Sequence, residues 1–79
     1  MSEPGGTWTV RRILEWTTNY FTRKEVFQPR LSAEQLLAHV LNYPRIRLYT
    51  DYDRALTEKD LSAYRSLVQR AVEDVRAIL

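Results

Sequence analysis

The sequence contains no cysteine, one histidine and two glycines among its 79 residues, and each scarcity excludes a kind of site. Without cysteine, the chain can form neither a disulfide nor a thiolate metal site. The single histidine, His39, has Gln35 and Tyr43 four positions away, so no second ligand stands at helical spacing. Gly5 and Gly6 both lie near the N-terminus, so no glycine-rich turn can hold a cofactor phosphate. We therefore expect no metal site and no cofactor site in this chain.

Long apolar runs are also missing from the sequence. No stretch approaches the roughly 20 apolar residues that span a bilayer, so we expect no membrane contact. Residues 1–6 (MSEPGG) lack the basic and apolar regions of a signal peptide, which favours a cytoplasmic protein. The length suits one small domain and not two. We predict a flexible leader over residues 1–7 and one domain over residues 8–79.

The charges do not favour one sign strongly, because 12 basic residues are interspersed with 10 acidic ones for a net charge of +2. A nucleic-acid-binding domain usually concentrates lysine and arginine on one face or in one run. Here the basic residues occur as scattered pairs, which are typical of a solvated surface. We therefore expect nucleic acid not to be a partner.

Apolar residues recur at steps of three and four, which is the period of an amphipathic helix. This pattern predicts helices from near Trp8 to Thr22, from Ser32 to Leu41, over Arg45–Thr50, and from Thr57 toward the end of the chain. Ser32 with Gln35 fits a capping box, and Pro29 favours an extended Gln28 before that helix. No stretch alternates with the two-residue period of a strand. The predicted fold is all-α, a small bundle of four to five helices with short loops.

Candidate catalytic residues are hard to assemble from this pattern. Ser32 and Ser62 have no nearby base, and the acidic residues from 51 to 60 stand near helix starts, where they stabilise caps. We therefore predict no catalytic residue. The predicted partner-binding residues are the exposed arginines and one loop tyrosine: Arg11, Arg12, Arg45, Arg47 and Tyr52. The alternative is that these arginines are ordinary solubilising charge.

Three segments resemble the N-terminal domain of the release factor glutamine methyltransferase (HemK/PrmC) family: ILEW at 13–16, PRLSAEQLLAHVL at 29–41 and YTDYDRALTEKDL at 49–61. The resemblance implies a parent enzyme that transfers a methyl group from S-adenosylmethionine to the glutamine of the Gly-Gly-Gln motif in peptide chain release factors. It places the cofactor and the Asn-Pro-Pro-Tyr motif in a C-terminal Rossmann-like catalytic domain, which this chain lacks. It assigns the helical N-terminal domain a role in positioning the release factor.

The resemblance is incomplete at the C-terminal end. Residues 70–79 (RAVEDVRAIL) have neither the glycine nor the proline of the family's usual linker, so the chain either diverges there or stays helical. From the residues alone, the alternative function is a free-standing helical adaptor or nucleic-acid-binding module.

Overall fold

A computed structural model describes residues 7–78, with side chains described as far as Asp74. Its elements are α1 (Val10–Arg23), α2 (Pro29–Leu41), α3 (Ile46–Thr50) and α4 (Glu58–Ile78). Within the described residues the one extended pairing is an isolated bridge between Thr9 and Ala55, so the all-α prediction is confirmed. No described helix is both long and apolar enough to cross a membrane. The predicted leader lies outside the described residues except for Thr7.

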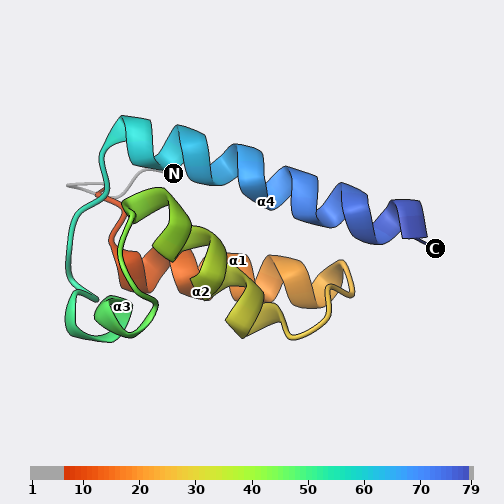
Figure 1. Ribbon diagram of the computed structural model, residues 1–79, viewed down its shortest axis with the longest axis horizontal. Helices are drawn as coiled ribbons and strands as arrows, with labels where there is room; N and C mark the ends of the chain where they lie inside the picture. The colour runs from red at the N-terminus through yellow and green to blue at the C-terminus, as the bar shows by residue number, and fades with distance from the viewer. Residues whose placement is uncertain (1–6, 79) are drawn as a thin grey trace.

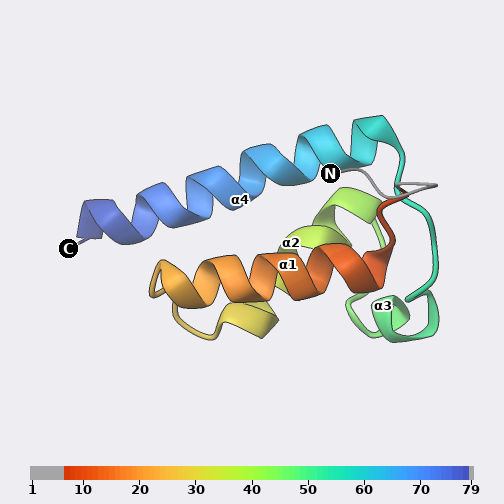
Figure 2. The ribbon, with the colours of Figure 1, turned by 180° about the vertical axis from the view of Figure 1, so that it is seen from behind.

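The helices form two layers. Helices α1 and α2 run antiparallel side by side, α4 runs lengthwise over them in nearly the same direction as α1, and α3 closes one end (Figure 1). The view from behind shows the same order, with α4 extending past the loop that joins α1 to α2 (Figure 2). Helix α4 continues unbroken to Ile78, so the chain stays helical where the family's linker pattern is missing.

The first turn of α1 is tied to the loop that precedes α4. Thr9 caps the helix with its side-chain oxygen. The N–H groups of Val10 and Arg11, which no earlier turn of the helix can satisfy, donate to the carbonyl oxygens of Arg54 (3.1 Å) and Tyr52 (3.0 Å). These bonds fix Tyr52 beside the start of α1, although more than forty residues separate them in the sequence.

Helix α2 begins at Pro29, three residues before the predicted start, so the predicted Ser32 cap is wrong. Proline suits the first helical position because its ring already holds a helical φ and its missing N–H needs no partner. Gln28 is left-handed, with φ 49°, rather than extended. The Ser32 hydroxyl instead donates to the carbonyl of Phe27 at 3.1 Å.

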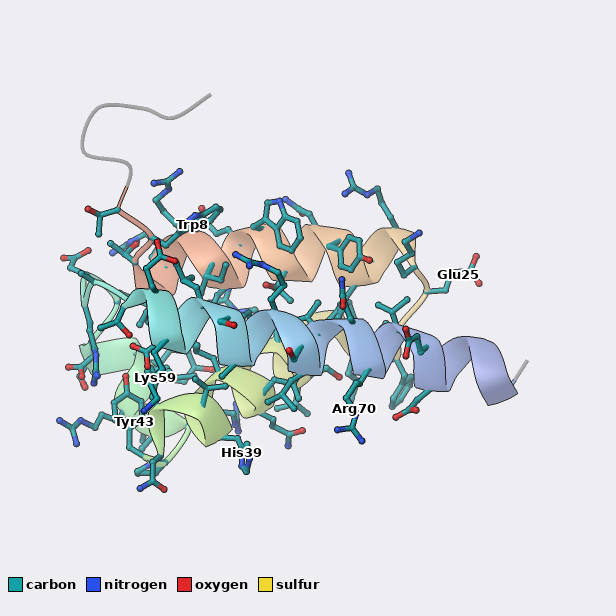
Figure 3. The ribbon with its side chains drawn as sticks, turned by 90° about the horizontal axis from the view of Figure 1, so that it is seen from above. Trp8, Glu25, His39, Tyr43, Lys59 and Arg70 are labelled. Atoms are coloured by element: carbon teal, nitrogen blue, oxygen red, sulfur yellow. The ribbon has the colours of Figure 1, made fainter. Side chains whose placement is uncertain are left out.

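The core follows the predicted apolar stripes. Its fully buried members come from all four helices, because α1, α2 and α4 each turn one face inward and α3 adds Leu48. The start of α4 is as predicted, and there Thr57 and Asp60 exchange side-chain to backbone hydrogen bonds of 3.1 and 3.0 Å. His39 is exposed and projects from the outer edge of α2 (Figure 3).

Three large apolar residues stay outside the core. Phe27 is 81% exposed, Ile46 72% and Trp16 48%. The left-handed turns at Glu25 and Gln28 redirect the loop so that Val26 points inward and Phe27 outward. In α3, a helix of one turn and a half can bury one side only, and Leu48 takes it.

Candidate docking surface around Glu34

A buried carboxylate organises the junction of α2 and α3. Glu34 is only 2% exposed, yet three donors reach it. Arg30 Nε, one turn earlier on α2, lies 2.8 Å from Oε2, while Arg45 Nη1 (2.9 Å) and the Tyr49 hydroxyl (2.7 Å) both donate to Oε1. The charge is therefore paired on both oxygens, as a buried charge must be to remain ionised.

The hydrogen bonds continue from Glu34 to the loop before α4. Arg30 Nη2 donates to the Tyr52 hydroxyl at 2.9 Å. The rings of Tyr49 and Tyr52 meet edge to face at 5.8 Å, and the Arg11 guanidinium lies 5.0 Å above the Tyr52 ring. We call this group the Arg–Tyr cluster; its members are Arg11, Arg30, Glu34, Arg45, Tyr49 and Tyr52.

The electrostatics keep the cluster charged. Burial by itself raises the pKa of Glu34, but the hydrogen bonds from Arg30, Tyr49 and Arg45 outweigh it and hold the pKa below its ordinary value. The hydrogen bond to Glu34 raises the pKa of Tyr49 in turn, so its phenol stays a donor. The guanidiniums of Arg30 and Arg45 both face the one buried carboxylate, so these three groups leave one net positive charge toward solvent. The Arg11 guanidinium lies 3.8 Å from the carboxylate of Asp53.

Two shallow clefts flank the exposed ring of Tyr49, each of about 420 Å³. One is lined by Arg11, Tyr52 and the turn that follows, and the other by Arg30, Arg45 and the start of α2. The side chains of Arg30 and Arg45 remain 43% and 45% exposed beside the buried Glu34. A partner can therefore reach the guanidiniums without disturbing the carboxylate beneath them.

The structure brings together three of the five predicted partner-binding residues. Arg11, Arg45 and Tyr52 belong to the Arg–Tyr cluster. Arg47 lies next to it on the outer side of α3, where its Nε is 3.5 Å from the Asp51 carboxylate and its guanidinium is 4.7 Å above the Tyr43 ring.

Arg12 lies apart from the other predicted residues. Its guanidinium is 4.7 Å above the Trp8 ring and donates to the carbonyl of Thr7 at 2.9 Å. Successive helical residues differ by about 100° in direction, which sends Arg11 toward the cluster and Arg12 to the other side of α1.

Sequence reasoning missed Glu34, Arg30 and Tyr49. Arg30 and Glu34 stand one turn apart, a spacing that predicts a helical ion pair. The stronger signal is the place of Glu34 on α2, one and two turns before the apolar residues Ala38 and Leu41. A carboxylate on an apolar stripe requires buried donors, and that requirement points to arginines from elsewhere in the chain.

The arrangement is suited to binding and offers little for bond-breaking chemistry. Glu34 accepts three hydrogen bonds, which leaves it poorly placed to take a proton from a substrate. The Ser32 hydroxyl donates to a backbone carbonyl and not to a base. Within the described residues no three metal-ligating side chains gather.

Comparisons with known proteins find relatives of this chain. The chain is 50% identical over 66 residues to a release factor glutamine methyltransferase of Rhodopirellula baltica, covering 84% of this chain and 22% of that protein. It is 42% identical to the enzyme of that name from Chlorobaculum tepidum over 84% of this chain and 22% of the relative. It is 40% identical to the enzyme of that name from Geobacter sulfurreducens, over 89% of this chain and 25% of the relative.

The chain therefore spans about a quarter or less of the length of these relatives. No solved structure matches it. The family described as the PrmC N-terminal domain matches residues 12–75, which include all of α2 and α3 and most of α1 and α4. Since this match extends over most of the chain, the protein belongs to the PrmC N-terminal domain family.

Proposed function

We propose that this chain is the substrate-docking domain of a cytoplasmic release factor glutamine methyltransferase. In this proposal a separate catalytic domain binds S-adenosylmethionine and methylates the Gly-Gly-Gln glutamine of a peptide chain release factor. The helical domain holds the release factor in position. The observation that carries the proposal is the family match over residues 12–75, together with relatives that bear this enzyme's name.

A docking domain contributes to catalysis without touching the reacting atoms. Binding energy gained far from the glutamine amide can be used to orient that amide at the catalytic centre. The Arg–Tyr cluster supports such a role, because arginine and tyrosine are the residues that most often anchor protein interfaces. Arg11, Arg45, Arg47 and Tyr52 are the proposed contacts on this face, and Arg12 extends them around α1.

The direct test is binding of the chain to a purified bacterial peptide chain release factor, measured by calorimetry. Arg11→Glu and Arg47→Glu reverse exposed charges without removing a partner of Glu34, and each is expected to weaken binding about tenfold, or 1.4 kcal/mol. Arg70→Glu, an equal charge change on the side of α4 labelled in Figure 3, is the matched control and should bind like the parent. Absence of any measurable binding at micromolar concentrations contradicts the proposal.

The second test concerns the cofactor. The chain alone should give no heat of binding when titrated with S-adenosylmethionine, because its described residues provide no glycine-rich loop at a strand end. Micromolar affinity for the cofactor would show that this chain contains part of the catalytic centre, and the docking role would then have to be abandoned.

A further inference from the structure

An apolar groove of about 350 Å³ runs between α1 and α4, on the side of α1 that faces away from the Arg–Tyr cluster. Its floor consists of the buried side chains of Ile13, Tyr64 and Val68. Trp8 stands at the end of α1 where this groove begins, with α4 alongside (Figure 3). Trp16, 48% exposed, stands on its α1 wall. The groove therefore offers apolar surface that the chain itself does not cover.

The α1 side of the groove is lined by the aromatic rings of Trp8, Trp16 and Tyr20, and two of these rings lie beside a cation. Arg12 lies 4.7 Å above the Trp8 ring, Trp16 stacks on Tyr20 at 5.2 Å with 15° between the ring planes, and Lys24 lies 5.8 Å from the Tyr20 ring centre.

The opposite wall adds a third cation. Arg65 of α4 is exposed and lines the groove, and within the described part of the chain it forms no ion pair. No carboxylate is among the described residues that line the groove. Apolar side chains on the floor with carboxylates at the rim would therefore complement this surface in both shape and charge.

The arrangement favours protein over nucleic acid. A nucleobase binds by stacking on an open ring face. Here Tyr20 is already stacked on Trp16 and lies beside Lys24, and Trp8 lies beneath Arg12. Among these three rings only Trp16 has a face with neither a ring nor a cation against it, so a run of stacked bases has no platform, whereas the aliphatic floor suits leucine-like side chains.

We propose that the groove between α1 and α4 binds a segment of the release factor that combines apolar side chains with aspartate or glutamate. This inference rests on the proposed function and adds the surface and the chemistry of the segment. Arg11 and Arg12 are neighbours in the sequence but point to different sides of α1, so the groove and the Arg–Tyr cluster are separate surfaces. The groove supplies apolar burial and the cluster supplies polar contacts.

The two tryptophans of the chain both line the groove, so their indole N–H signals in a proton–nitrogen NMR spectrum report on its occupancy. Addition of purified release factor is expected to shift both signals. Trp16→Ala and Arg65→Glu, at unchanged melting temperature, should each weaken binding at least tenfold. Phe27→Ala, which removes an even more exposed ring outside the groove, and Arg70→Glu are the matched controls and should stay within twofold of the parent.

The failures are distinguishable. Release factor that binds the groove variants as tightly as the parent, without moving the indole signals, overturns this inference and leaves the docking function intact. Absence of any binding overturns both. If polyuridylate shifts the indole signals and the release factor does not, the groove is an RNA site. A dimer in sedimentation experiments that Trp16→Ala dissociates shows a second copy of the chain as the occupant. Either of these results also refutes the inference.

Discussion

Replacing Glu34 by glutamine tests whether the buried carboxylate holds α2 and α3 together. The variant keeps the size of the side chain and removes its charge. Hydrogen bonds to charged groups contribute about 1.5–3 kcal/mol each, and three reach Glu34. Arg30 and Arg45 are nearly half exposed and can regain water, so the losses do not add. We expect a net loss of about 2 kcal/mol in the free energy of unfolding, which is the contribution of one hydrogen bond to a charged group.

That loss is large for a chain of this size. Small domains have a total stability of roughly 0.05–0.15 kcal/mol per residue, and 1 kcal/mol shifts the midpoint by roughly 4–8 °C. Glu34→Gln should therefore melt about 10 °C below the parent at pH 7, as followed by far-ultraviolet circular dichroism. Glu73→Gln, an equal change at an exposed position of α4, is the control and should melt like the parent.

The pH dependence gives the sharper test. The pKa of Glu34 is held below its ordinary value of 4.5, so the ionised carboxylate stabilises the folded state above that value. This contribution is lost as the pH falls through the lowered pKa, because the parent then carries a neutral carboxyl as well. The gap between the melting temperatures of parent and variant should narrow as the pH falls below 4.5. Equal melting temperatures at pH 7, or a gap that acid leaves unchanged, would refute this account of Glu34.

Two further predictions concern the core. Leu37→Ala removes a fully buried side chain and should lower the free energy of unfolding, measured with urea, by about 2–5 kcal/mol. Leu36→Ala, at a partly buried neighbour, should lower it clearly less. Equal losses would contradict the assigned core. Burial raises the pKa of Tyr64 to about 12, so its neutral phenol stabilises the fold below pH 10 and this contribution is lost as the pH rises toward 12. Tyr64→Phe should remove that alkaline loss, and a variant that loses stability there as the parent does would disprove the assignment.

The sequence predicts most of the fold because the relevant signals are local. Apolar residues at steps of three and four identify α1 and α4. The starts of these helices are marked by Thr9 and Thr57, whose side chains accept hydrogen bonds from backbone N–H groups only three residues later. The start of α2 is the exception. Pro29 and Ser32 both signal a helix start there, and the choice between them depends on whether Gln28 adopts a left-handed conformation. Val26, in the same loop, is buried in the core, and this tertiary contact favours that conformation. No local sequence pattern indicates it.

The candidate site is less predictable because its members come from distant parts of the chain. Glu34 receives hydrogen bonds from Arg45 and Tyr49, which lie 11 and 15 residues later, and Tyr52 reaches Arg11 only because α1 bonds to the loop before α4. The prediction of exposed arginines is confirmed for Arg11, Arg45 and Arg47, whereas Arg12 is only partly exposed. The local pattern could not show which of them share a surface, since that depends on how α3 folds back onto α2.

A buried ion pair is an expensive way to stabilise a domain, because the cost of removing charges from water cancels much of their attraction. At Glu34 the main effect of the buried ion pair is to orient the neighbouring side chains. The carboxylate fixes the directions of Arg30, Arg45 and Tyr49, so these side chains have already lost rotamer freedom before a partner arrives. Each immobilised side chain would otherwise cost about 0.5–1.5 kcal/mol on binding. Burial of one acid beneath exposed bases thus lowers the entropy lost on binding, which would favour the proposed docking role.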